Sequence, residues 1–184
     1  MNTLSFPLSN QLVAVVAPHA AMPMMVEIAA RLALNGAVRV LDGGNRFNVY
    51  PVAQAVRRLT PRLEETLSHI TLSRAFTCYQ VVTLLQETPA RPLPTLVLDI
   101  LSTFLDENVT LEESQRLLKV SIEQLTRLSL AAPVVVSVKP LLALSADRLP
   151  LLDMLSEAAS RTIVLEEPRP QPSAALPLWQ QSAD

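Results

Sequence analysis

Six short apolar runs, spaced along the chain with helix-like segments between them, constrain the fold of this sequence most strongly. The runs are rich in Val, Leu and Ile and are apolar at nearly every position, as in VVVSV at 134–138. Such runs are typical of strands that are covered on both faces, as in a parallel sheet. The expected strands are Leu12–Ala17, Ala37–Asp42, His69–Ser73, Thr95–Asp99, Pro133–Val138 and Arg161–Glu166.

The segments between these runs have the periodicity and the end signals of helices. Gly36 is a good stop signal for the first of them, which is apolar nearly all round and is therefore expected to be mostly buried. Thr110 and Glu113 predict a capping box. The expected helices are Pro23–Asn35, one that begins at Pro51, Phe76–Glu87, Thr110–Leu130 and Arg148–Ser160. Regular alternation of strands and helices predicts an α/β fold, a three-layer α/β/α domain with a mainly parallel sheet.

Composition narrows the class of protein. A chain of 184 residues suits one domain, which we place at 1–167, followed by a Pro-rich C-terminal tail at 168–184. The formal net charge of −2 excludes a general attraction to nucleic acid or to an anionic membrane. A single cysteine, Cys78, fits a reducing compartment. The N-terminus lacks the pattern of a signal peptide and no apolar stretch is long enough to span a membrane, so we expect a cytoplasmic protein.

Several segments, in chain order, resemble RecA-like recombination ATPases. VRVLDGGNRF at 38–47 is similar to their second core strand, and PTLVLDILSTF at 94–104 to their Walker B strand. ITLSRAFTCYQVVTLL at 70–85 carries the most weight, because it resembles the Arg-Ala-Phe segment of the archaeal RadA-like branch. The resemblance covers roughly residues 11 to 140. It implies a RecA-like P-loop NTPase fold and a role in DNA recombination or repair.

The phosphate loop of that family is degenerate here. Its pattern, G-x-x-x-x-G-K-[ST], falls on Ala17, Met22, Pro23 and Met24. Met22 places a side chain where bare backbone would approach a phosphate. Pro23 removes a helix N-terminal N–H and replaces the lysine, and Met24 cannot ligate magnesium. The resemblance therefore implies a pseudo-ATPase without a catalytic residue.

The other nucleotide-site positions implied by the resemblance are also altered. Gly44 stands where the family carries a glutamate that prepares the attacking water, and Ser137 and Lys139 bracket the position that senses the γ-phosphate. Asp99 matches the magnesium-associated aspartate, but a lone carboxylate makes a poor magnesium site, so no metal is expected. Asp42 followed by two glycines predicts a plain turn, because no G-x-G-x-x-G follows the first strand. A small-molecule pocket at the carboxyl edge of the sheet, beside Asp42 and Asp99, is the alternative of an enzyme type.

Basic residues are concentrated in one third of the chain. Arg57, Arg58 and Lys139 are candidate nucleic-acid contacts, Lys139 because it follows the fifth strand. A solvated surface is the favoured interpretation, since aromatic residues make up only 4 % and no stacking platform is evident. His19 is interpreted as an ordinary loop histidine, and Cys78 as a buried, inert thiol.

Three hypotheses of function follow. The first is a catalytically inactive RecA-like domain that binds another protein, either a copy of itself or a RecA-like ATPase, and needs no cofactor. The second is an ATPase that binds ATP and magnesium with a non-standard phosphate loop, using donors such as Arg46 or Lys139. The third is an accessory protein that binds single-stranded DNA.

Overall fold

Six parallel strands form one sheet in the order β3-β2-β4-β5-β1-β6. The computed structural model describes residues 10–141 and 147–166, so the predicted tail at 168–184 lies outside the described residues. The strands are β1 (Leu12–Val16), β2 (Val38–Asp42), β3 (Ile70–Arg74), β4 (Thr95–Leu98), β5 (Val134–Val138) and β6 (Arg161–Val164). All six were predicted from the sequence within one or two residues at each end.

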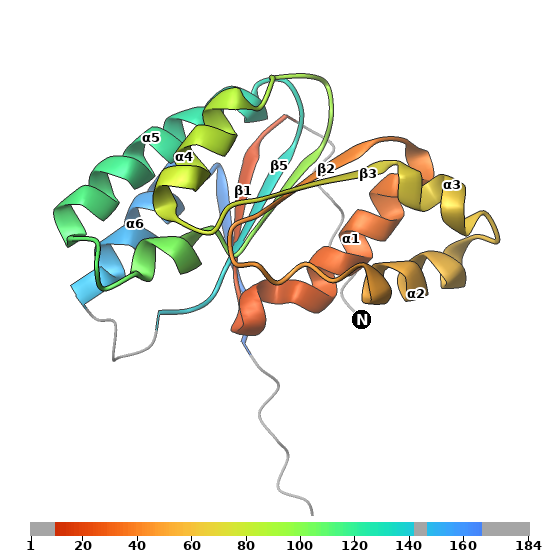
Figure 1. Ribbon diagram of the computed structural model, residues 1–184, viewed down its shortest axis with the longest axis horizontal. Coiled ribbons are helices and arrows are strands. Elements are labelled where there is room, and N and C mark those ends of the chain that lie inside the picture. The colour runs from red at the N-terminus through yellow and green to blue at the C-terminus, as the bar shows by residue number, and fades with distance from the viewer. Residues whose placement is uncertain (1–9, 142–146, 167–184) are drawn as a thin grey trace, which may run out of the picture.

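Helices cover both faces of this sheet (Figure 1). The first layer packs α1 (Met22–Asn35), α2 (Val49–Leu59) and α3 (Leu63–Ser68) together, and the second packs α4 (Cys78–Glu87), α5 (Leu111–Ser129) and α6 (Leu149–Ala158). Two 3-10 helices follow β1 and β4: η1 (Pro18–Ala21) and η2 (Ile100–Leu105). The predicted three-layer α/β/α architecture is therefore confirmed.

The strand order explains the two layers. From β1 the chain crosses over β5 and β4 to β2, continues to β3, and then returns across the sheet through β4 and β5 to β6. Because nearly all crossovers between parallel strands are right-handed, a reversal of direction moves the helices to the other face. The chain therefore leaves β1 and its neighbour β5 toward opposite faces of the sheet. It also leaves β2 and its neighbour β4 toward opposite faces. At such points the carboxyl ends of the strands border a crevice.

Side chains alternate between two cores, one on each face of the sheet. Val134, Val136 and Val138 of β5 belong to the core under α4, α5 and α6. Val135, between them, belongs to the core under α1 and α2. The central strands β1 and β5 are therefore apolar at nearly every position because helices cover both faces of the sheet.

Two helix predictions are corrected by the structure. α2 begins at Val49 rather than at Pro51, because the Asn48 side chain accepts a hydrogen bond of 2.9 Å from the backbone N–H of Tyr50 and caps the helix two residues earlier. The short helix α3 was not predicted.

Two further expectations are only partly met. The buried residues of α1 are Met25 and the three alanines at 29, 30 and 33, so the helix is half-buried rather than mostly buried. Thr110 caps α5 by accepting a hydrogen bond from Glu113 N, but the Glu113 carboxylate pairs with Arg116 instead of completing the capping box.

Candidate functional site

Two aspartates lie side by side in the fold at the carboxyl edge of the sheet. Asp42 is the last residue of β2, and Asp99 follows β4, which pairs directly with β2. Their side chains are 0 % and 2 % exposed. Gly44 lies against Asp99, because a Cβ atom built on Gly44 would be 2.6 Å from the Cβ of Asp99. The glycine is therefore required for the loop after β2 to approach Asp99 this closely.

Asp42 holds the loop that follows it. Its Oδ1 accepts a hydrogen bond of 3.1 Å from the backbone N–H of Arg46, and its Oδ2 accepts one of 2.9 Å from that of Phe47. Arg74, at the end of the adjacent β3, places Nε 3.3 Å from Asp42 Oδ2 and donates from Nη2 to the Phe47 carbonyl at 2.6 Å. The Asp42 carboxylate is thus used within the protein and fixes residues 43–47.

Asp99 is neutralised by two cations from other parts of the chain. Lys139 Nζ, after β5, lies 2.8 Å from Asp99 Oδ2, and Arg46 Nε lies 3.2 Å from the same oxygen. Neither contact has hydrogen-bond geometry, so the oxygen is held by charge pairing. The backbone N–H of Asp99 donates to Ser137 Oγ at 3.2 Å.

The charges at this edge nearly balance. The two carboxylates of Asp42 and Asp99 face the three cations Arg46, Arg74 and Lys139, which leaves one net positive charge. The described residues contain no group of three or more His, Cys, Asp or Glu side chains that could hold a metal ion. Both carboxylates are therefore already paired with cations of the protein itself.

The loop between β1 and α1 has unusual backbone geometry. His19, Ala20 and Ala21 have φ values of 53°, 52° and 52°, in the left-handed region. Helix α1 begins directly afterwards without a side-chain cap, and Pro23 in its first turn has no N–H to donate.

The left-handed residues gather at the carboxyl edge. Besides the three in η1, Asn45 after β2 and Asp99 after β4 have positive φ. Each costs on the order of 1 kcal/mol or more for a residue with a side chain. The chain has only three glycines, and all five of these left-handed positions are occupied by residues with a side chain. Strained backbone of this kind clusters at functional sites more often than elsewhere.

A hollow of about 390 Å³ opens at the start of α1. Its lining residues are His19, Met22, Pro23, Val26, Arg46, Asn48 and Pro51. Two of the four phosphate-loop positions, Met22 and Pro23, therefore form part of an apolar wall. Ala17 is buried instead, and its N–H continues the ladder between β1 and β5 by donating to the Val138 carbonyl at 3.1 Å. Met24 is half-buried and is not among the lining residues.

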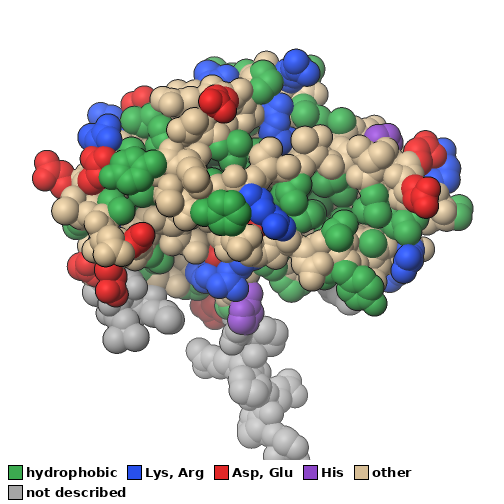
Figure 2. Space-filling model, in the orientation of Figure 1, with side chains coloured by type: hydrophobic (Ala, Val, Ile, Leu, Met, Phe, Trp, Pro, Cys, Tyr) green, Lys and Arg blue, Asp and Glu red, His purple; other side chains and the backbone are tan. Residues whose placement is uncertain are grey.

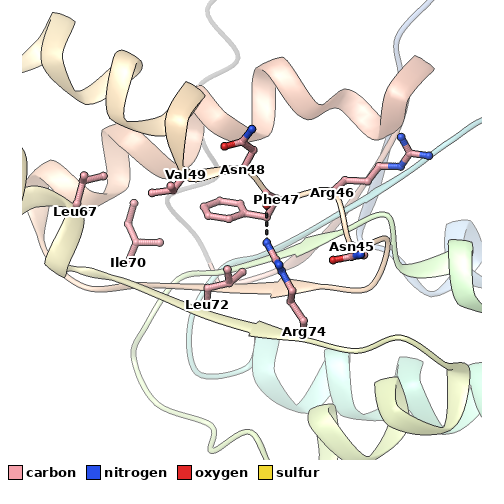
Figure 3. A pocket seen from close by; sticks show the side chains of 9 residues that line it. All are labelled: Asn45, Arg46, Phe47, Asn48, Val49, Leu67, Ile70, Leu72 and Arg74. Carbon is pink, nitrogen blue, oxygen red and sulfur yellow. Dashed lines mark hydrogen bonds between the residues drawn. The ribbon is translucent and has the colours of Figure 1, made fainter.

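A larger hollow, of about 600 Å³, lies beside β3 (Figure 3). It is lined by Asn45, Arg46, Phe47, Asn48, Val49, Leu67, Ile70, Leu72 and Arg74. The apolar side chains surround the Phe47 ring at one end, and Asn45 and Arg46 lie toward the other (Figure 3). Alternate residues of β3, namely Ile70, Leu72 and Arg74, all face this hollow, as expected for one face of a strand.

β3 is an edge strand, because it pairs only with β2 within the described part of the sheet. Leu72 is 38 % exposed, and Val49 beside it is 59 % exposed. Figure 2 shows hydrophobic side chains gathered over the half of this face that carries β3, α2 and α3. An open strand edge next to exposed apolar side chains is a template for pairing with another chain.

The candidate nucleic-acid contacts are not brought together. Arg58 pairs with Glu27 at 3.4 Å, and Arg57 is exposed in the last turn of α2. Lys139 lies at the carboxyl edge, where it contacts Asp99 rather than either arginine. The sequence analysis named Arg46 as a possible phosphate donor but assigned neither Arg46 nor Arg74 a partner within the protein. Their positions just after β2 and at the end of β3 were the available signal.

Cys78 is buried at the start of α4, and burial raises the pKa of its thiol above the ordinary value. The thiol is therefore protonated and shielded, in line with its interpretation as an inert group.

Within residues 10–141 and 147–166, no helix combines the length and the apolar character needed to cross a membrane. The sequence matches no protein-family model, and no relative is found among the curated proteins.

Proposed function

We propose that this chain is a RecA-like domain that binds another protein and does not hydrolyse nucleotides. The observation that carries the proposal is the start of α1, where Met22 and Pro23 line an apolar hollow in place of the backbone donors, lysine and hydroxyl of a phosphate loop. The pairing of Asp99 with Lys139 and Arg46 supports it, because a carboxylate already neutralised by the protein has little capacity to hold magnesium.

The arrangement of the resembling segments supports a RecA-like assignment. The segment at 38–47 forms β2, and the segments at 70–85 and 94–104 begin with β3 and β4, its two neighbours in the sheet. The strands β2, β3 and β4 all end at the carboxyl edge, where Asp42, Arg74 and Asp99 lie.

The edge of β3 is the proposed protein-binding surface, and a second copy of this chain is the proposed occupant. The other open edge is β6, which pairs only with β1 in the described part of the chain. If β6 of one copy were added parallel to β3 of the next, the strand ends would align. The exposed Glu166, two residues after β6, would then lie just beyond Arg74 and close to the net positive charge of that edge. This contact is head-to-tail, so it builds open chains of subunits.

Sedimentation velocity over a range of protein concentrations tests this proposal. We expect reversible association of the wild type that is abolished by Leu72→Asp, which places a charge in the hollow beside β3. Leu130→Asp is the matched control, because Leu130 is 76 % exposed at the end of α5, away from both strand edges. Amide hydrogen exchange should show protection of residues 70–74 at high concentration.

Two results would count against this proposal. A protein that stays monomeric at several hundred micromolar, alone and mixed with a RecA-like ATPase, would overturn protein binding as the function. A complex with the ATPase without self-association would retain protein binding and overturn the second copy as the occupant.

One observation favours nucleotide binding as a second candidate function. Arg46 lines the hollow at the start of α1, where a non-standard phosphate donor is needed, and Lys139 shares Asp99 with it. This candidate requires ATP to displace the pairing with Asp99. Phosphate release that stays at background, with and without DNA, would exclude ATP hydrolysis.

A further inference from the structure

The hollow beside β3 has an apolar end and a polar end (Figure 3). The Phe47 ring lies at the apolar end, where Leu67, Ile70 and Leu72 line the wall. The volume of about 600 Å³ is within the range of roughly 300–1,000 Å³ that is usual for sites of small molecules. The proposed function uses the open backbone edge of β3 and assigns no ligand to this hollow.

The apolar end combines a fixed floor with uncovered walls. Phe47 is buried, and its backbone is held on both sides, because its N–H donates to Asp42 Oδ2 at 2.9 Å and its carbonyl accepts from Arg74 Nη2 at 2.6 Å. Leu72 and Val49 remain exposed. An apolar group placed over these two side chains and the Phe47 ring would remove all of them from water, which favours binding.

Two arginines and no acidic residue line the polar end. Asp42 and Asp99, the partners of Arg74 and Arg46, lie behind the lining. Arg46 approaches Asp99 Oδ2 through Nε, at 3.2 Å, and its side chain is 47 % exposed. Within residues 10–141 and 147–166, neither Nη group of Arg46 forms a hydrogen bond. A guanidinium that is held through Nε can still donate from both of its Nη groups.

Two asparagines add donors at this end. Asn48 uses its Oδ1 to cap α2, which leaves its Nδ2 group available. Asn45 has a φ of 51°, a left-handed conformation that asparagine adopts more readily than most residues, and it lies beside Arg46 in the hollow (Figure 3). Because Asp42 fixes the loop over residues 43–47, these groups are placed before any ligand binds.

The length of β3 separates the two ends. Ile70, Leu72 and Arg74 are alternate residues that line the hollow, and a strand rises about 3.3 Å per residue, so Ile70 and Arg74 are roughly 13 Å apart. A ligand that fills the hollow therefore needs an extended apolar body with a polar group at one end. A compact anion would leave the apolar end uncovered, and a plain hydrocarbon would leave the donors of the polar end unused.

We propose that this hollow binds a straight-chain carboxylate of medium length, with its carboxylate against Arg46 and its chain over Phe47 and Leu72. A planar guanidinium matches the two oxygens of a carboxylate with two parallel hydrogen bonds, and the two Nη groups of Arg46 provide this pair. The site is separate from the junction between β1 and α1, and it does not require that a second copy bind at the edge of β3.

Titration with sodium octanoate at pH 7, followed in two-dimensional amide NMR spectra, tests the site. We expect saturable shifts centred on residues 45–49 and 70–74. 1-Octanol has the same chain without the charge, and it should bind about tenfold more weakly or worse, because hydrogen bonds to a charged group are lost. The protein is kept below the concentration at which it associates, so a failure of self-association leaves this test intact.

Three variants locate the two ends of the ligand. Asn45→Asp keeps the shape of the side chain and tolerates the same φ, but it adds a negative charge at the polar end, so it should weaken octanoate about tenfold or more and leave 1-octanol unchanged. Val49→Asp places a charge at the apolar end, at the first position of α2 where the helix dipole accepts it, and should weaken both ligands. Gln86→Glu is the matched control, because it adds the same charge at an exposed position of α4 in the other helix layer, and both affinities should stay as in the wild type.

Several results would overturn the proposal. Equal affinity for octanoate and 1-octanol would show that the guanidinium groups take no part in binding. Octanoate binding that is unchanged in both Asn45→Asp and Val49→Asp, or shifts centred outside residues 45–49 and 70–74, would place the ligand elsewhere. The absence of any saturable shift with octanoate would exclude the site.

Discussion

Lys139→Met removes the nearer of the two cations that hold the buried Asp99 carboxylate, and we expect it to destabilise the protein. The Nζ–Oδ2 distance is 2.8 Å, at which two charges attract with roughly 6 kcal/mol at an effective dielectric constant of about 20. The measured loss will be smaller, because the Lys139 side chain is 34 % exposed and Arg46 remains 3.2 Å from the same oxygen. We therefore expect the free energy of unfolding to fall by about 2 kcal/mol.

A double-mutant cycle separates charge pairing from the packing of the lysine stem. Asp99→Asn removes the charge and keeps the shape, so its combination with Lys139→Met should show a coupling free energy of about 1–3 kcal/mol. Urea unfolding at pH 7, followed by circular dichroism, measures all four proteins. Lys119→Met is the matched control, because Lys119 is exposed on α5 and forms no ion pair within the described residues. If the effects of Asp99→Asn and Lys139→Met on the free energy of unfolding add within about 0.5 kcal/mol, the charge pairing at this edge is refuted.

Three further predictions concern single positions. Gly44→Ala should lower the free energy of unfolding by about 1–3 kcal/mol, because its Cβ would lie 2.6 Å from that of Asp99, and urea unfolding measures the loss. Thr110→Ala should cost about 1 kcal/mol and lower the melting temperature by roughly 2–4 °C, since it removes the cap of α5; an unchanged melting temperature would contradict this. Hydrogen bonding to Arg116 lowers the pKa of Glu113 below its ordinary value of 4.5. The pairing of Glu113 with Arg116 therefore stabilises the protein at pH values above 4.5, and this stabilisation is lost as the pH falls through the lowered pKa of Glu113. The difference in the free energy of unfolding between the wild type and Glu113→Gln should therefore shrink in acid.

Much of the fold could be predicted because local patterns determine it. β1 is apolar at each position and β5 at every position but Ser137, and this indicated burial on both faces before the layers were known. The helix α3 escaped prediction because its six residues are too few to establish a periodicity. Its first turn, with Glu64 and Glu65, indicated only a solvated surface. The early start of α2 depends on the Asn48 side chain, whose capping role was overlooked in favour of Pro51.

The candidate site was harder to predict because its contacts are non-local. Asp42 and Asp99 could be placed at the carboxyl edge from the strand pattern alone. Their partners could not, because pairing Asp99 with Lys139 requires that β4 and β5 be neighbours, and the sequence does not fix the strand order. The left-handed backbone of Ala20 was unpredictable for a different reason, since alanine has no preference for that conformation and surrounding structure imposes it.

Titration of the protein with fluorescently labelled ATP and magnesium tests the central claim most directly, because the claim is that the first strand–helix junction no longer holds a triphosphate. We expect that the protein shows no saturable binding of labelled ATP at micromolar concentrations. In particular, we expect no binding that is lost when Asp99 or Arg46 is replaced. Micromolar binding that is abolished by Asp99→Ala would contradict the account.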